Sequence, residues 1–76
     1  MMKIEMEIER TNWKIEDEIE TVKKMKRAIE RTMENFNEVT SPYELAHYAM
    51  KMKEATERRR MLEQQKKSLV WIAKED

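Results

Sequence analysis

His47 is the side chain best suited to chemistry, because it is the only histidine among 76 residues. On a helix, with Lys51 one turn further along, it could accept a phosphoryl group. However, the residues around it lack the acidic neighbour and the glycine that are typical of phosphotransfer sites. We therefore interpret His47 as a half-buried aromatic residue beside Tyr43 and Met50.

Most other reactive groups are missing from the composition. The chain has no glycine for a phosphate-binding loop, and it has no cysteine and too few histidines for the common zinc sites. No nucleophile is accompanied by a base and an orienting group. We expect neither catalysis nor a cofactor nor a metal ion, so the chain is not expected to be an enzyme.

Location is also predicted from composition. The absence of cysteine is compatible with a reducing compartment. Glu5 interrupts the apolar run that a signal peptide would need near its start. The longest apolar run, 69–73, falls far short of the roughly 20 residues of a membrane span. We expect a cytoplasmic protein without a membrane partner, of the kind found among bacterial or phage accessory proteins.

Charge is balanced overall but arranged in blocks. Sixteen basic residues match sixteen acidic ones. Residues 1–20 hold three basic and seven acidic residues, and residues 21–33 hold five and one. If the chain folds back on itself, basic residues from both halves form a central belt, which could follow a nucleic-acid backbone or could simply be solvated. The belt consists of Lys23, Lys24, Lys26, Arg27, Arg31, Lys51, Lys53, Arg58, Arg59 and Arg60.

Methionine and tryptophan suggest a different kind of surface. The chain has eight methionines and two tryptophans. Met25, Met33 and Met52 lie on predicted core stripes and need no other explanation, whereas several other large apolar residues do not fit between two helices. Because Trp and Met are enriched at interfaces, we expect these residues to contact a partner protein or a second copy. They are Met6, Trp13, Met50, Met61, Val70 and Trp71.

The segment 40–44 organises the chain, because it holds the only proline. Ser41 and Glu44 have the spacing of a capping box, in which each side chain accepts a hydrogen bond from the backbone N–H of the other. Pro42 then falls at the first helical position. A proline disfavours helix in the preceding residue, so an earlier helix should end near Glu38 or Val39.

The residues before this turn predict an amphipathic helix over about 3–38. Its stripe has a seven-residue period through Ile8, Ile15, Val22, Ile29 and Phe36. Between these lie weak positions such as Glu18 and Thr32, for which we expect Ile19 and Met33 to substitute. Residues 2–9 also alternate apolar and polar residues, as a strand paired in a dimer would. We favour helix there, because Glu is a poor strand residue.

The second predicted helix runs over 42–73 after a turn at 39–41. Its core stripe is interrupted at Arg59 and Lys66, and a secondary face carries Tyr43, His47, Met50, Met61 and Trp71. Packed antiparallel, Phe36, Met33, Ile29 and Met25 would stack on Leu45, Tyr48, Met52 and Ala55. Ile15, Ile8 and Ile4 would stack on Leu62, Leu69 and Ile72. Trp13 and Trp71 would lie within about one helical turn of each other at the open end.

Together these patterns predict an all-α fold over 1–76, a single antiparallel two-helix hairpin of coiled-coil type that dimerises into a four-helix bundle. The expected function is that of a small non-enzymatic regulator or adaptor that binds another protein. An RNA- or DNA-binding hairpin dimer that uses the basic belt is the first alternative. A structural assembly subunit is the second.

Overall fold

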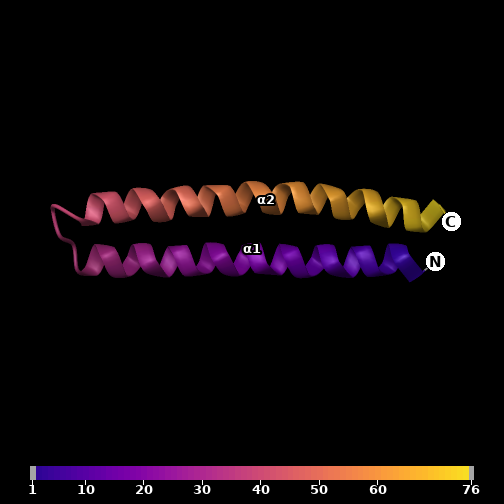
Figure 1. The fold of residues 1–76 in the computed structure, drawn as a ribbon, viewed down its shortest axis with the longest axis horizontal. Coiled ribbons are helices and arrows are strands. Elements are labelled where there is room, and N and C mark those ends of the chain that lie inside the picture. The colour runs from indigo at the N-terminus through magenta and orange to yellow at the C-terminus, as the bar shows by residue number, and fades with distance from the viewer. Residues whose placement is uncertain (1, 76) are drawn as a thin grey trace.

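The protein is a helical hairpin. The computed structural model describes residues 2–75 and contains two helices, α1 (Met2–Glu34) and α2 (Ser41–Glu75). They pack antiparallel along their whole length, so both chain ends lie at one end of the molecule (Figure 1). The hairpin measures 58 × 14 × 12 Å. The predicted all-α hairpin is confirmed.

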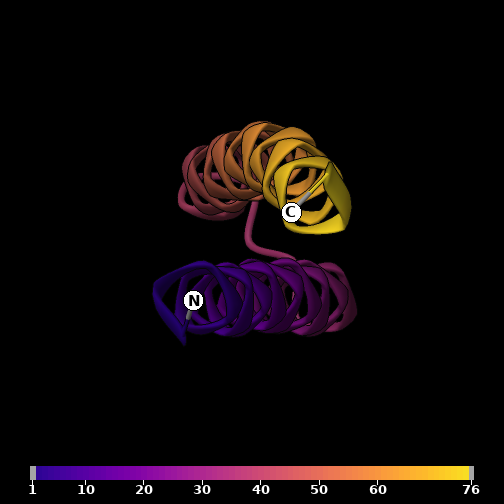
Figure 2. The ribbon, with the colours of Figure 1, turned by 90° about the vertical axis from the view of Figure 1, so that its right-hand side faces the viewer.

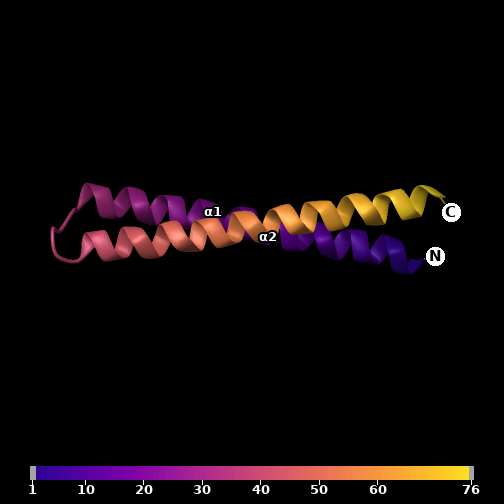
Figure 3. The same cartoon turned by 90° about the horizontal axis from the view of Figure 1, so that it is seen from above.

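The two helices form a single pair with no third layer. Viewed along the long axis, α1 and α2 lie one above the other (Figure 2). Viewed from above, they cross at a shallow angle (Figure 3). Each helix can therefore cover only one side of the other, and its opposite side faces away from the hairpin.

Residues 2–9 belong to α1. The strand considered for this segment is therefore wrong, despite its alternating pattern. Glu5, Glu7 and Glu9 favour helix, and a helix satisfies its backbone groups within the segment, whereas a strand would need a partner strand.

The side of α1 that faces α2 follows the predicted seven-residue period. Thr11 and Thr32 are among its most buried residues, although both are polar. Each hydroxyl donates to the carbonyl four residues back, at 2.7 Å to Glu7 and 2.8 Å to Ala28. The buried or half-buried residues at these positions are Ile4, Ile8, Thr11, Ile15, Glu18, Val22, Met25, Ile29 and Thr32.

The prediction that Met33 takes the place of Thr32 on the side of α1 that faces α2 is wrong. Its side chain is 60% exposed, whereas that of Thr32 is buried. The period of α1 alone sets which residue faces α2, and the internal hydrogen bond of Thr32 removes the cost of burying its hydroxyl. Met33 is thus left on the surface.

The facing side of α2 completes the contact, which we call the inner seam. Ala55 is fully buried, so the two backbones can approach closely there. Arg59 remains exposed, and Lys66 is half-buried. The buried or half-buried residues of α2 at this spacing are Ser41, Leu45, Tyr48, Met52, Ala55, Leu62, Lys66, Leu69 and Ala73.

The connection spans residues 35–40 and is longer than the predicted turn at 39–41. α1 ends at Glu34, four residues before the predicted end, because Asn37 offers the backbone an alternative to helix. Its Oδ1 accepts from the backbone N–H groups of Val39 (2.8 Å) and Thr40 (3.2 Å). Phe36, expected on the core stripe, lies in this connection and is exposed.

Ser41 joins the connection to α2 in a way that differs from the predicted capping box. The Glu44 N–H donates to the Thr40 carbonyl at 3.2 Å, so α2 begins at Ser41 and Pro42 is its second residue. The Ser41 hydroxyl instead accepts from the Asn37 N–H at 2.7 Å, and the Ser41 N–H donates to the Asn37 carbonyl at 2.9 Å. Ser41 is only 2% exposed, so this reciprocal pair is shielded from water.

The earlier end of α1 shifts the helices by about one turn near the connection. Glu18 pairs with Arg58, and Ala28 and Tyr48 border the same groove. Val22, not Met25, therefore falls in the layer of Ala55. The expected pairs at the open end, Ile15 with Leu62 and Ile8 with Leu69, agree with this register.

We predict that Ser41→Ala lowers the free energy of unfolding by about 1–2 kcal/mol, because the shielded Asn37 N–H loses its acceptor. Urea unfolding at a fixed protein concentration measures the change. Ser68→Ala is the matched control, since Ser68 is exposed on α2. Equal stability of the two variants would contradict this role for Ser41.

Candidate protein-binding surface

The ten residues of the predicted basic belt are all exposed, but they do not form one face. Arg58, Arg59 and Arg60 are consecutive, so their side chains point in different directions around α2. The observed register also places this triplet beside the acidic segment 16–20 of α1 rather than beside the basic block of α1. The belt is therefore divided.

Three arginines of the belt are engaged in ion pairs. Arg58 Nε donates to Glu18 Oε2 at 2.7 Å. Arg59 pairs with Glu63 at 3.2 Å, and Arg27 pairs with Glu20 at 3.8 Å. The hydrogen bond to Glu18 raises the pKa of Arg58 above its ordinary value. These partners compete with phosphate groups for the same cations.

The pair between Glu18 and Arg58 also connects the two helices. Of the four ion pairs found within residues 2–75, it is the one that joins α1 to α2. Glu18 faces α2 at a position where an apolar residue would normally lie, and its side chain is only 17% exposed. Arg58 thus satisfies a carboxylate that the period of α1 turns toward the inner seam.

The predicted interface residues are mostly exposed. Trp13 is 59% exposed and Trp71 is 64% exposed. Met6, Met50 and Met61 are exposed as well, whereas Val70 is half-buried. Large apolar side chains in water are the feature that most often marks an interface when they lie on a common face.

Helical spacing gathers three of these six residues, Met50, Met61 and Trp71, on one side of α2. Steps of four and three residues from Tyr43 reach every residue on the side opposite the inner seam. We call this side the outward seam. All ten of its residues are exposed, and none is Lys or Arg. They are Tyr43, His47, Met50, Glu54, Glu57, Met61, Gln64, Ser68, Trp71 and Glu75.

The corresponding side of α1, its outward face, has a different character. Met6 and Trp13 are its large apolar residues, and its other eight residues are charged. They are Lys3, Arg10, Asp17, Glu20, Lys24, Arg27, Arg31 and Glu34. α1 therefore has one apolar stripe, which α2 covers, whereas α2 has apolar residues on two opposite sides and only one of them is covered.

This arrangement separates the two tryptophans. In the observed register, Trp13 lies level with Glu63, about two helical turns from Trp71 along the axis. Each occupies the side of its helix that faces away from the other helix. They therefore belong to two surfaces rather than to the single cluster expected at the open end.

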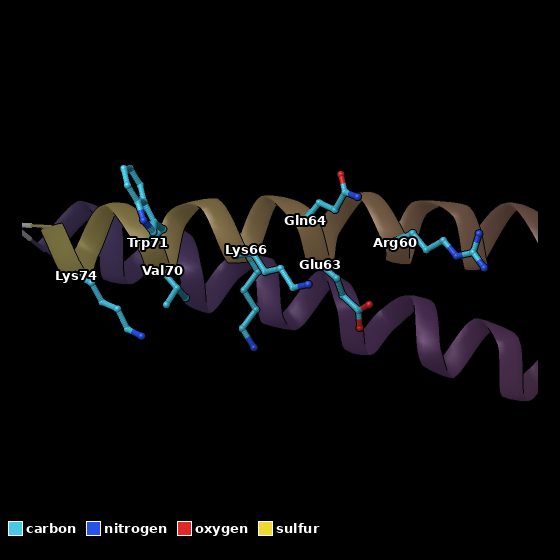
Figure 4. A pocket seen from close by; sticks show the side chains of 8 residues that line it. Arg60, Glu63, Gln64, Lys66, Val70, Trp71 and Lys74 are labelled. Atoms are coloured by element: carbon cyan, nitrogen blue, oxygen red, sulfur yellow. The ribbon is translucent and has the colours of Figure 1, made fainter.

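Trp71 stands between two shallow grooves near the end of α2. One is bordered by Arg60, Gln64, Lys67 and Lys74, and the other by Ser68 and Ile72. Trp71 and Gln64 project to the same side of α2, whereas Val70 and Lys66 project to the other side (Figure 4). The indole is thus accessible from both sides and is flanked by basic side chains.

His47 belongs to the outward seam rather than to a half-buried cluster. It is exposed, and its ring centroid lies 5.8 Å from that of Tyr48. Within the described part of the chain, no three His, Asp or Glu side chains gather in the way that a metal ion would need. His47 is one aromatic member of a wider surface.

Sequence reasoning found the apolar members of this surface but missed its basic border. Of the basic residues beside the outward seam, Lys51, Lys53, Arg58 and Arg60 were assigned to the central belt, whereas Lys67 and Lys74 were assigned to no surface. The spacing of four and three residues on the far side of α2 distinguishes the apolar residues of the outward seam from the basic residues beside it.

The chain was compared with protein-family models, curated proteins and solved structures, and no match was found. Neither α1 nor α2 combines the length and the apolar character of a membrane span, over the residues described. The assignment of function therefore depends on the surfaces of the hairpin.

We predict that the hairpin does not retard duplex DNA or an RNA hairpin in gels at physiological salt, because the belt does not form one face and three of its arginines already pair with acidic residues. The Arg58→Gln, Arg59→Gln, Arg60→Gln triple variant is the comparison. Retardation by the parent protein that is lost in this variant, and that weakens steeply with salt, would contradict the prediction.

Proposed function

We propose that this chain is a small non-enzymatic cytoplasmic protein, a regulator or adaptor, that acts by binding another protein through the outward seam of α2. The single observation that carries the proposal is the exposure of Tyr43, Met50, Met61 and Trp71 along one continuous stripe without a basic residue. Its size and composition suit a bacterial or phage accessory protein.

The chemistry of the stripe supports protein binding. Trp and Tyr supply large contact areas at low entropic cost, and Trp is the residue type most enriched among binding hot spots. Methionine is flexible and polarizable, so Met50 and Met61 could fit partner surfaces of different shape. None of these side chains is used inside the hairpin.

We also propose that the hairpin forms a homodimer, which would be a four-helix bundle. The support is the thin interior of a single hairpin. Among the described residues, Ile15 and Ala55 are the buried apolar ones. Pairing with a second copy would cover further apolar surface and offset the small core of a 76-residue chain.

Two alternative functions would use the outward seam, the outward face of α1 or the basic belt. A structural assembly subunit would bind only copies of itself, through the outward seam or the outward face of α1. A nucleic-acid-binding hairpin would use the basic belt, which the ion pairs of Arg27, Arg58 and Arg59 disfavour.

We predict that light scattering at micromolar concentration returns a mass of about 19 kDa, twice the chain mass of 9.4 kDa. The measurement is repeated over a dilution series, because a dimer dissociates on dilution. A mass of one chain at all concentrations would refute the homodimer without affecting the binding proposal.

We predict that the tagged hairpin retains a protein partner from native host lysate with or without nuclease. Trp71→Gln in the bait should abolish retention by removing a hot spot. Trp13→Gln is the control, because Trp13 is similarly exposed but lies on α1. Retention that nuclease abolishes would support the nucleic-acid function instead, and retention of nothing but the chain itself would support the assembly subunit.

A further inference from the structure

The charged residues along the border of the outward seam of α2 are basic, except Glu44 in the first turn of the helix. Along one edge, at a seven-residue spacing, lie Lys53, Arg60, Lys67 and Lys74, all exposed. Along the other edge lie Lys51 and Arg58. In a packed helix pair, residues that border the contact stripe face the partner's border residues and determine which partner is accepted.

This border disfavours a second copy of α2 as the occupant. In an antiparallel pair of α2 helices, the edge with Lys53, Arg60, Lys67 and Lys74 would face the same edge of the other copy. In a parallel pair, it would face the edge with Lys51 and Arg58. Both arrangements bring like charges together, which costs binding free energy.

The centre of the seam adds a second requirement. Glu54 and Glu57 lie between Met50 and Met61, and both are exposed. An occupant must therefore be apolar toward the two ends of the seam, acidic at its borders, and polar or basic opposite the central glutamates. A lipid bilayer fits poorly, because its acyl region would desolvate Glu54 and Glu57.

We propose that the outward seam of α2 docks one acidic amphipathic helix of a partner protein, which packs on the side of α2 opposite α1. This inference rests on the proposed function and names its site and its class of partner. The partner helix presents apolar residues in steps of three and four, as in other helix-in-groove contacts. Glu or Asp residues flank these and pair with the basic border.

The test uses synthetic helical peptides as probes. The acidic peptide has Leu at the contact positions, Glu at both borders and Lys in the two central contact positions. The basic peptide is identical except for Lys at the borders. Binding of each labelled peptide to the full chain is followed by fluorescence anisotropy over a salt series.

We expect the acidic peptide to bind at least about tenfold more tightly than the basic one, with the difference shrinking as salt rises. Trp71→Gln should weaken binding by at least about tenfold, and Trp13→Gln should leave it unchanged. Changing Lys53, Arg60, Lys67 and Lys74 to Glu should reverse the preference between the peptides.

Several results would overturn the inference. Equal binding of both peptides, equal loss with Trp13→Gln and Trp71→Gln, or binding of anionic phosphatidylserine vesicles in place of the peptides would each do so. The proposed function fails separately, when the bait retains no nuclease-resistant partner. A partner that is retained from lysate and released by Trp71→Gln, while the acidic and basic peptides bind equally, would preserve the proposed function and refute this class of partner.

Discussion

A helix in a two-helix hairpin can bury only one side, and the structure follows from this constraint. In α1, most apolar residues form one stripe that α2 covers, and the outward face is largely charged. In α2, by contrast, apolar residues lie on two opposite sides of the helix. The inner seam covers one of these sides, and the other side, with Trp71 at its end, remains in water.

The contact between α1 and α2 along the inner seam includes several polar residues whose hydrogen-bonding groups are satisfied. Thr11 and Thr32 donate to carbonyls of their own helix, so their burial leaves no hydroxyl unsatisfied. Glu18 is satisfied by Arg58 of the other helix. Because the Arg58 side chain is largely exposed, this ion pair contributes little to stability by itself. This pair matters more for register, because a shift of one turn would leave the half-buried carboxylate without its partner.

The connection sets that register. Asn37 accepts hydrogen bonds from two backbone N–H groups and exchanges two more with Ser41, which fixes the last turn before α2. The register in turn decides which charges meet. It brings Arg58 to Glu18 and so divides the belt. The position of Lys53, Arg60 and Lys67 at the edge of the outward seam follows instead from the period of α2.

Much of the fold could be predicted from sequence, because it depends on periodic patterns. The seven-residue period identified Ile8, Ile15 and Val22 as facing residues, and the same logic identified the far side of α2. The turn could not be predicted, because Ser41 matches a capping box and Asn37 matches a competing turn, and only their packing decides between the two. The error at Phe36 follows from that single choice.

The most direct test of the second, outward-facing seam uses the methionine methyl groups in solution NMR. The ε-methyl signals are recorded during titration with the acidic helical peptide. Met50 and Met61 should shift, because they lie on the outward seam. Met6 on the outward face of α1, and Met25 and Met52 in the inner seam, should not. Shifts at Met6, or unchanged signals from Met50 and Met61 with bound peptide, would contradict a second contact surface on α2.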